Sequence, residues 1–324
     1  MIVVTGGAGF IGSALVYKLN QLGEEEITIV DELGEGDKWK NLNGLNFIDF
    51  LSIDEFIELI INDAVPFEIE AIFHMGACSS TTERDADYLI QNNYHYTQDL
   101  AKYCLLHKSR FIYASSAATY GDGSNGYDDD QSNLRILRPL NMYGYSKHIT
   151  DLWLHKMGMI EEVVGLKFFN VYGPNEYHKN DMRSVVHKSF EQIRDTGKVK
   201  LFKSYRDEYK DGEQVRDFIY VKDAVDMMLH FYENRNRNGL YNIGTGKART
   251  WIDLVTAVFN AMEKKVNIEF IDMPEEIRDK YQYHTEANIE KLRSAGYDKD
   301  ISSLEDGVED YVKNYLLKDK YLGM

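Results

Sequence analysis

Residues 1–12 read MIVVTGGAGFIG, and this stretch decides the fold. The β-branched run at residues 2–4 is typical of a buried parallel strand. Gly6, Gly9 and Gly12 follow it and open a stretch that carries apolar residues at helical spacing. Glycine leaves backbone N–H groups uncovered, and a helix N-terminus attracts negative charge. A strand, a glycine turn and a helix therefore predict a pyrophosphate site.

A second apolar run, at residues 27–30, ends at Asp31, which is followed by Glu32. In dinucleotide-binding folds an acidic side chain at this point accepts hydrogen bonds from the adenosine ribose. The alternative is a tight strand-to-helix turn that binds nothing, but the strand, turn, helix and acid in register favour a dinucleotide. Two adjacent carboxylates would also repel a 2′-phosphate, so the local charge favours NAD.

The chain has 324 residues, of which 44% are hydrophobic, enough for one large α/β unit and a smaller lobe. A net charge of −16 argues against a nucleic-acid or membrane-surface partner. No apolar run is long enough to span a bilayer. With a strand at residue 2 we expect no secretory signal, and two cysteines, Cys78 and Cys104, predict free thiols in the cytoplasm.

Apolar runs alternate with helical segments through the first half of the chain, which predicts an α/β fold with a doubly wound parallel sheet of Rossmann type. The expected strands are at 2–5, 27–31, 45–49, 71–75, 110–115 and 163–169. The expected helices are at 10–22, 53–63, 86–107 and 143–158. We therefore place a dinucleotide-binding domain at residues 1–170.

Beyond Pro174 the pattern becomes irregular and more charged, which predicts a smaller C-terminal α/β lobe, residues 171–324, for the substrate. Its expected elements are a helix near 182–196, a strand at 199–202, a polar surface loop at 204–214, strands at 217–222 and 239–244, and a helix near 304–316. We expect part of 217–250 to complete the first domain, so that the two lobes are interleaved.

Tyr143 and Lys147 stand four residues apart at the start of a predicted helix, so they share one face. A nearby ammonium lowers the pKa of a phenol, which can then accept a proton from an alcohol near neutral pH. Ser116 ends a predicted strand at the sheet edge where such folds place active sites, within reach of a reacting oxygen. Among 23 tyrosines such a pair can also be an exposed helix face, but the glycine turn favours chemistry.

Together these features resemble the extended short-chain dehydrogenase/reductase family over nearly the whole chain. Further family motifs are Asn170-Val171-Tyr172-Gly173-Pro174 and the segments 216–223 and 241–246. Members mostly act on nucleotide-linked sugars as epimerases, dehydratases or decarboxylases. The resemblance implies a nicotinamide cofactor in the large lobe and a sugar nucleotide in the smaller one.

Segments 75–83, 113–121, 176–179 and 281–285 resemble, more narrowly, the branch of this family that epimerises ADP-linked heptoses. That resemblance implies inversion of C6 of ADP-D-glycero-D-manno-heptose by transient oxidation and re-reduction, in the synthesis of lipopolysaccharide core heptose. The hydroxyl lies on different sides of the site in substrate and product. The resemblance therefore implies that Tyr143 serves one epimer and Lys179 the other, although Lys179 could instead be a phosphate-binding lysine.

The resemblance also implies further binding positions. The cofactor positions are Gly6, Gly9, Phe10, Ile11, Gly12, Asp31, Glu32, Lys38, Met75, Gly76, Ala77, Cys78, Ser79, Asn92, Lys147, Val171 and Lys179. The substrate positions are Ser116, Asn170, Asp181, Lys188, Phe202, Lys203, Ser204, Tyr205, Arg216 and Tyr281. Arg216 suits a pyrophosphate because its planar fork grips phosphate oxygens, and the alternative is a structural ion pair with Asp217 or with a carboxylate at the sheet edge.

The chain departs from the family at Asp181, Lys188 and Ile53, where a serine, a histidine and a lysine are common. The resemblance implies tightly bound NADP, with Lys38 facing the 2′-phosphate, whereas the two carboxylates after the second strand favour NAD. It also implies a homo-oligomer. The histidines and cysteines show no metal-ligand spacing, so we expect no metal site.

Two alternatives remain open. One is another sugar-nucleotide enzyme of the 4-epimerase or dehydratase type, although Ala117 follows Ser116 where dehydratases usually carry an Asp-Glu pair. The other is a catalytically silent sensor that only binds the cofactor. A sensor needs the glycine turn but not Ser116, Tyr143 and Lys147, whose presence favours an enzyme.

Overall fold

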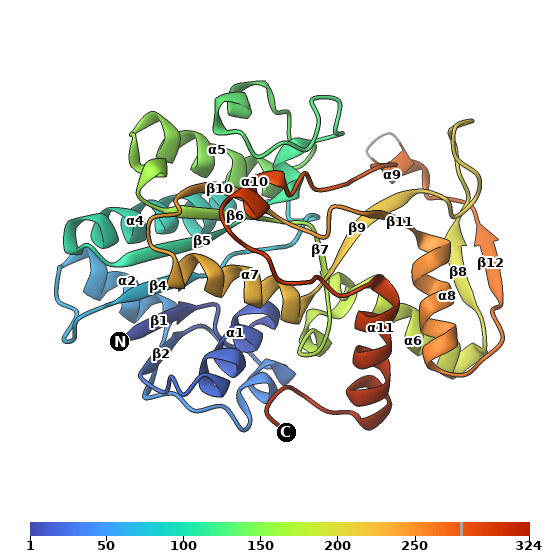
Figure 1. Ribbon diagram of the computed structural model, residues 1–324, viewed down its shortest axis with the longest axis horizontal. Helices are drawn as coiled ribbons and strands as arrows, with labels where there is room; N and C mark the ends of the chain where they lie inside the picture. Colours follow the sequence, from blue (N-terminus) through green and yellow to red (C-terminus); the bar gives the residue numbers. More distant parts are fainter. Residues whose placement is uncertain (279–280) are drawn as a thin grey trace.

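A seven-stranded parallel sheet forms the centre of the computed structural model, which describes residues 1–278 and 281–324 (Figure 1). The strand order is β10-β6-β5-β4-β1-β2-β3. Strand order therefore reverses between β4 and β1, and ligands bind beyond the carboxyl ends of the strands at such a switch point. The sheet confirms the predicted Rossmann-type fold.

The elements of this first part alternate along the chain as the sequence predicted. Its strands are β1 (Ile2–Thr5), β2 (Ile27–Val30), β3 (Asp49–Leu51), β4 (Ala71–His74), β5 (Arg110–Ser116), β6 (Val164–Phe168) and β10 (Gly239–Ile243). Its helices are α1 (Phe10–Gln21), α2 (Ile53–Ile61), α3 (Ala86–Leu89), α4 (Tyr96–His107), α5 (Met142–Lys156) and α7 (Val221–Glu233).

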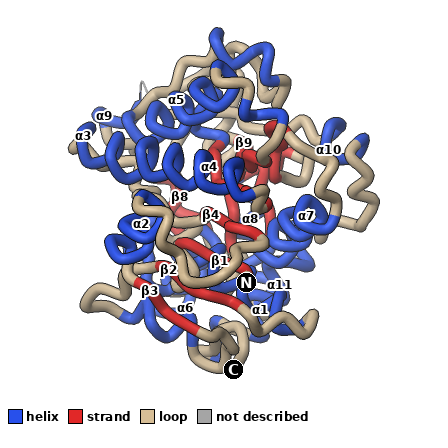
Figure 2. Tube along the Cα trace, turned by 90° about the vertical axis from the view of Figure 1, so that its left-hand side faces the viewer, coloured by secondary structure: helices blue, strands red, loops and turns tan. Residues whose placement is uncertain are grey.

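Both faces of the sheet are covered, because neighbouring strand residues point to opposite sides. Val4 belongs to an apolar cluster with Leu15 of α1 and residues of α7. Val3 belongs to a second cluster with Phe56 of α2 and Leu100 of α4. Figure 2 shows the strands running between these two groups of helices. The glycine turn after β1 is thus fixed from both sides.

In the described part of the chain, the second lobe contains two small sheets and four α-helices, and it lies at one end of the molecule (Figure 1). Its strands are β7 (Asn170–Tyr172), β8 (Val199–Phe202), β9 (Val215–Tyr220), β11 (Ala248–Thr250) and β12 (Ile268–Ile271). Its helices are α6 (Val185–Thr196), α8 (Trp251–Ala261), α9 (Glu275–Arg278) and α11 (Leu304–Asn314), and α10 (Glu290–Ser294) lies against β10. The chain leaves the central sheet after β6 and returns through α7 to β10 before it leaves again.

Three predicted elements were wrong in their bounds. The strand expected at 45–49 is β3, which begins at Asp49, because the buried Leu45 packs in the core without pairing to a strand. The strand expected at 217–222 spans Val215–Tyr220, and Val221 already starts α7. The helix expected at 86–107 is interrupted by a π-helical segment, Ile90–His95.

The π-helical segment has a local consequence. It carries Asn93, whose side chain accepts a hydrogen bond from Cys78 N at 2.9 Å and donates one to Cys78 O at 3.0 Å. The same amide donates to Ser146 Oγ of α5 at 3.0 Å. A π-bulge often marks a functional site, and here it fixes the loop after β4 against the helix that carries Tyr143.

Candidate active site

The glycine turn between β1 and α1 has room for backbone only. Gly6 has a φ of 67°, and a Cβ there would lie 2.5 Å from Gly76 N. A Cβ on Gly12 would lie 2.1 Å from Gly6 O. The N–H of Gly9 donates a hydrogen bond to Gly6 O at 2.9 Å. The carbonyl of Gly9 accepts a hydrogen bond from Ser13 N at 3.0 Å, and this is the first backbone hydrogen bond of α1. The bare turn at a helix N-terminus fits the pyrophosphate of a dinucleotide.

A cavity of about 640 Å³ opens above this turn. Its lining includes every predicted cofactor position except Lys147 and Val171, which line the neighbouring cavity. Other residues that line this cavity were not predicted from the sequence, and they are Thr5, Val30, Asp54, His74, Ser80, Tyr88, Tyr96, His178 and Met182. Several of them are sequence neighbours of a predicted position. The sequence motifs therefore indicated where the cavity lies but not all of the residues that line it.

The corner of this cavity beyond β2 is acidic. The buried Asp31 accepts a hydrogen bond from Ala8 N at 2.9 Å and from Glu32 N at 2.7 Å, and it pairs with Lys38. The Lys38 ammonium also donates to Glu32 O at 2.9 Å. Asp54 and the uncharged Ile53 line the same cavity. The lining of the whole cavity therefore carries three carboxylates and two ammonium groups, of which Lys38 is already paired with Asp31 and the other is Lys179.

A second cavity of about 350 Å³ adjoins the first, and the two share lining residues that include Phe10, Met75 and Lys179. Ser116 from the end of β5 lines it, as do Tyr143 and Lys147 from α5. Asn141 caps α5 by accepting a hydrogen bond from Gly144 N at 2.7 Å, which sets where the helix begins. The structure thus brings the four predicted acid/base residues to one cavity.

The protonation of Tyr143 differs from the sequence expectation. Burial raises the pKa of its phenol, while a hydrogen bond with Ser116 acts in the opposite direction. We expected Lys147 to lower this pKa, but the net shift is upward, because the cost of burying the phenolate exceeds the effect of the Ser116 hydrogen bond. Burial also lowers the pKa of the Lys147 ammonium, to about 8, and the charge of Asp151 opposes this shift.

The carboxylate of Asp151 belongs to a buried polar network beneath the site. It pairs with Lys167 of β6 at 2.6 Å and accepts hydrogen bonds from Tyr113 at 2.8 Å and Ser115 at 2.8 Å. Lys167 also donates to Thr119 Oγ1 at 2.7 Å. A buried ion pair is retained only when its remaining donors and acceptors are satisfied, as they are here. The network fixes α5 against β5 and β6.

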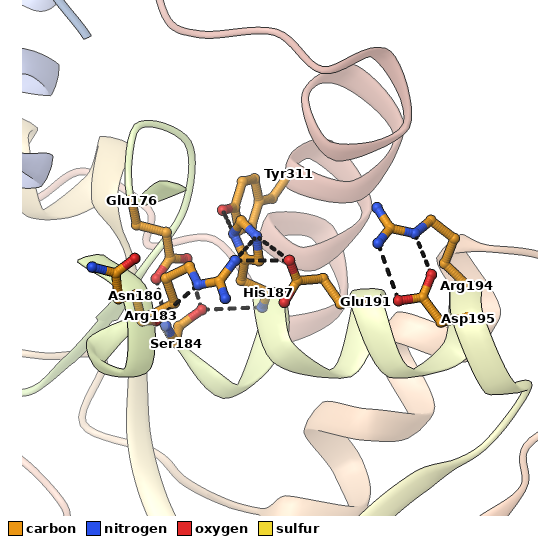
Figure 3. Close-up of polar contacts among 9 residues, drawn as sticks. All are labelled: Glu176, Asn180, Arg183, Ser184, His187, Glu191, Arg194, Asp195 and Tyr311. Carbon is orange, nitrogen blue, oxygen red and sulfur yellow. Dashed lines mark hydrogen bonds and ion pairs between the residues drawn. The ribbon is translucent and has the colours of Figure 1, made fainter. Parts of the chain in front are cut away.

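Lys179 reaches both cavities from the 3-10 segment Tyr177–Met182. Its ammonium lies 5.3 Å from the centroid of the Phe10 ring. Burial lowers the pKa of Lys179, and the charge of Glu176 opposes that shift. The buried Glu176 carboxylate accepts a hydrogen bond from the Ser184 hydroxyl at 2.7 Å, which joins this segment to the start of α6 (Figure 3).

Arg216 lies in the second lobe outside the two cavities. Its guanidinium is 5.2 Å from the ring centroid of Tyr281 and 5.6 Å from that of Trp251, which lines the second cavity. Asp217 instead accepts hydrogen bonds from Thr245 N at 2.7 Å and Gly246 N at 2.9 Å. The alternative of an Arg216–Asp217 ion pair was therefore wrong, and the guanidinium forms no ion pair within the described part of the chain.

The other predicted substrate positions divide into three groups. Asn170 lines the second cavity, whereas the segment 202–205 clusters near Tyr281 and Tyr283, with Tyr205 N donating to Tyr283 Oη at 2.9 Å. Asp181 and Lys188 line neither cavity, and Lys188 donates to Asp181 O at 2.5 Å. Residues that line the second cavity and were not predicted from the sequence include Arg183, Ser184, Val185, Val186, Phe218, Trp251 and Leu254.

Within residues 1–278 and 281–324, no three His, Cys, Asp or Glu side chains come together as ligands for a metal ion. Over the same residues, every helix is too short or too polar to cross a bilayer.

Comparison with known proteins defines the class of this chain. The model of the NAD-dependent epimerase/dehydratase family matches residues 2–244, so the chain belongs to that family. A protein of Nitratidesulfovibrio vulgaris (strain DP4) named ADP-L-glycero-D-manno-heptose-6-epimerase is 54% identical over 316 residues, which cover 98% of each chain.

Two solved structures have a similar fold. The Helicobacter pylori ADP-L-glycero-D-manno-heptose-6-epimerase has a TM-score of 0.79 at 27% identity, covering 97% of this chain and 95% of its own. The UDP-N-acetylglucosamine 4-epimerase of Methanobrevibacter ruminantium M1 has a TM-score of 0.82 at 25% identity, covering 98% of both chains.

Proposed function

We propose that this protein is an isomerase that inverts C6 of ADP-D-glycero-D-manno-heptose, with a resident nicotinamide dinucleotide. The observation that carries the proposal is that Tyr143 and Lys179, which come from different elements, line one cavity beside the glycine turn. The family and the 54% identical heptose epimerase support it. The reaction belongs to the supply of heptose for lipopolysaccharide core.

Inversion of a carbinol carbon requires a hydroxyl proton to leave on one side of the site and return on another. When bound, the nicotinamide supplies the place where the C6 hydride is held between the two halves of the reaction. Tyr143 holds or removes the hydroxyl proton of one epimer, and Ser116 donates a hydrogen bond to the same oxygen. Lys179 does the same for the other epimer, because its ammonium loses its proton more readily when buried.

Lys147 acts through charge and position. Its ammonium is buried and Lys147 lines the same cavity as Tyr143, with Asp151 opposing the fall in the lysine pKa. In this place it favours the phenolate when Tyr143 gives up a proton, and it is within reach of a cofactor ribose. Arg216 and its aromatic neighbours in the second lobe bind the diphosphate of the substrate, because a planar guanidinium suits phosphate oxygens. Its terminal nitrogens donate to Val215 O at 2.8 Å and to Gln282 O, and phosphate oxygens replace these carbonyls when the substrate binds.

Membership of the NAD-dependent epimerase/dehydratase family indicates a nicotinamide dinucleotide. The carboxylates of Asp31 and Glu32, which line the first cavity, favour NAD over NADP. In NADP, which the sequence resemblance implies, a 2′-phosphate at Lys38 would compete with Asp31 for that ammonium and would lie close to the carboxylates of Asp31 and Glu32. We therefore expect NAD to bind at least about tenfold more tightly, the factor for about 1.4 kcal/mol of repulsion.

This cofactor preference is tested by releasing the dinucleotide from purified protein and identifying it by mass spectrometry, together with Kd values for both forms. We expect NAD in the released fraction and a smaller NAD preference in Glu32→Gln. Glu35→Gln, an exposed change outside the cavity, is the matched control and should leave the ratio unchanged. Released NADP, or a lower Kd for NADP, would contradict the preference.

A second candidate function is a 4-epimerase of UDP-sugars, favoured by the TM-score of 0.82 with the UDP-N-acetylglucosamine 4-epimerase. The two functions share the glycine turn and the Ser116–Tyr143–Lys147 group, and they differ in what Lys179 and the second lobe contact. A silent sensor is disfavoured because the four acid/base residues share one cavity. Incubation with ADP-D-glycero-D-manno-heptose and, separately, with UDP-glucose distinguishes these functions by NMR of the sugar.

The cytoplasmic location and the homo-oligomer stay predictions. The buried free thiol of Cys104 is in keeping with a reducing compartment.

A further inference from the structure

Asn175 lies two residues before the segment Tyr177–Met182 that carries Lys179, and it is not among the residues that line the two cavities. It is fully buried, with a φ of 75° that side chains other than asparagine and glycine rarely adopt. Its side chain donates to Ser13 Oγ at 2.9 Å and accepts a hydrogen bond from Leu322 N at 2.9 Å. Both ends of one buried amide are therefore used to join distant parts of the chain.

Each of these contacts leads to a part of the active site. Ser13 lies in the first turn of α1, and its hydroxyl donates to the carbonyl of Phe10 at 3.3 Å. The Phe10 ring lies 5.3 Å from the Lys179 ammonium. Asn175 is thus connected through Ser13 to Phe10, whose ring the Lys179 ammonium contacts.

A second buried amide side chain, that of Asn41, also connects Asn175 to the glycine turn. It donates to Asn175 O at 3.0 Å and to Ala8 O in the glycine turn at 2.9 Å. It also lies 3.1 Å from His178 Nδ1, next to Lys179. Ala8 in turn donates its N–H to Asp31, so the amides connect the cofactor turn to the Lys179 segment.

The C-terminal tail completes the support. The buried Leu322 supplies the N–H bound by Asn175, and Tyr177 donates its hydroxyl to Lys320 O at 3.0 Å. The rings of Tyr177 and Tyr321 lie 4.7 Å apart. The last residues of the chain therefore cover the outer side of the segment that carries Lys179.

We propose that Asn175 is a positioning residue that holds Lys179 in register with the glycine turn and the C-terminal tail. The acid/base role of Lys179 that this inference serves rests on the proposed function. A displacement of about 1 Å in a reacting group can lower a rate by about 100-fold. Loss of the amide also leaves the buried N–H of Leu322 without its acceptor, which loosens the segment.

The test is Asn175→Gly in the full-length protein with its bound cofactor, because glycine keeps the positive φ and removes the amide alone. We expect kcat to fall between about 10- and 100-fold with little change in KM. We also expect a higher pKa for the Lys179 amine, measured by pH-dependent acetylation and mass spectrometry, because a loosened segment exposes it to water. Ser13→Ala should change both quantities in the same direction by less.

Lys108→Gly is the matched control, since Lys108 also has a positive φ, of 59°, and lies on the surface at the end of α4. It should leave kcat and Lys179 acetylation unchanged. Folded Asn175→Gly and Ser13→Ala proteins with normal Lys179 acetylation and normal kcat would overturn the proposal. If Lys179→Met retained full epimerisation, the proposed role of Lys179 would fail instead, whereas the acetylation shift would still report the positioning.

Discussion

We expect Tyr143→Phe to lower kcat for heptose epimerisation by about 10²- to 10⁴-fold, the range that one general acid/base group contributes. The phenol lines the second cavity and shares a hydrogen bond with Ser116, so its oxygen is placed to exchange a proton with a substrate hydroxyl. Phenylalanine keeps the ring and removes only that oxygen. The measurement is steady-state turnover together with thermal unfolding.

The matched control for this variant is Tyr145→Phe, on the same helix, where the side chain is 54% exposed. It should retain full activity, and both variants should unfold at temperatures close to that of the unmodified protein. Epimerisation at the normal rate by Tyr143→Phe would show that the phenol has no part in proton transfer.

The second large effect is expected for Lys179→Met, which keeps an apolar side chain of similar length over the Phe10 ring and removes the amine. If Lys179 handles the hydroxyl proton of one epimer, kcat falls by about 10²- to 10⁴-fold. If it only binds a phosphate, kcat changes little and the KM or the Kd of the nucleotide rises instead. We expect the first result, because the ammonium reaches both cavities.

Lys200→Met serves as its control, since Lys200 is an exposed lysine on β8 outside both cavities. It should leave kcat and nucleotide affinity unchanged. A Lys179→Met protein with normal kcat and weakened nucleotide binding would assign the lysine to phosphate binding and remove the second acid/base group from the mechanism.

The sequence predicted the central sheet, and most of the expected cofactor positions line one cavity, because both depend on local patterns. At Gly6 and Gly12 a Cβ would clash with nearby backbone atoms, so only glycine fits there. Such positions can be recognised from the sequence because the residue type itself reports the close contact. The strand ends at Thr5 and Ser116 follow from β-branched and apolar runs in the same local way.

Other features were hidden because they depend on contacts between distant segments. Arg183 and Trp251 line the second cavity only because α6 and α8 are brought to the end of β5, and no motif marks them. Thr250 and Asp253 form a capping box that could have revealed α8, although it does not reveal where the helix packs. The pKa of Tyr143 was misjudged because burial is a property of the folded site.

The central claim is a redox-neutral inversion of one carbon by two proton-transfer groups beside a resident dinucleotide. NMR of ADP-D-glycero-D-manno-heptose with purified protein in D₂O, without added cofactor, tests it most directly. The account predicts inversion at C6 with the original hydrogen retained, because that hydrogen leaves and returns without passing through solvent. Deuterium at C6 of the product, or conversion of UDP-glucose alone, would contradict it.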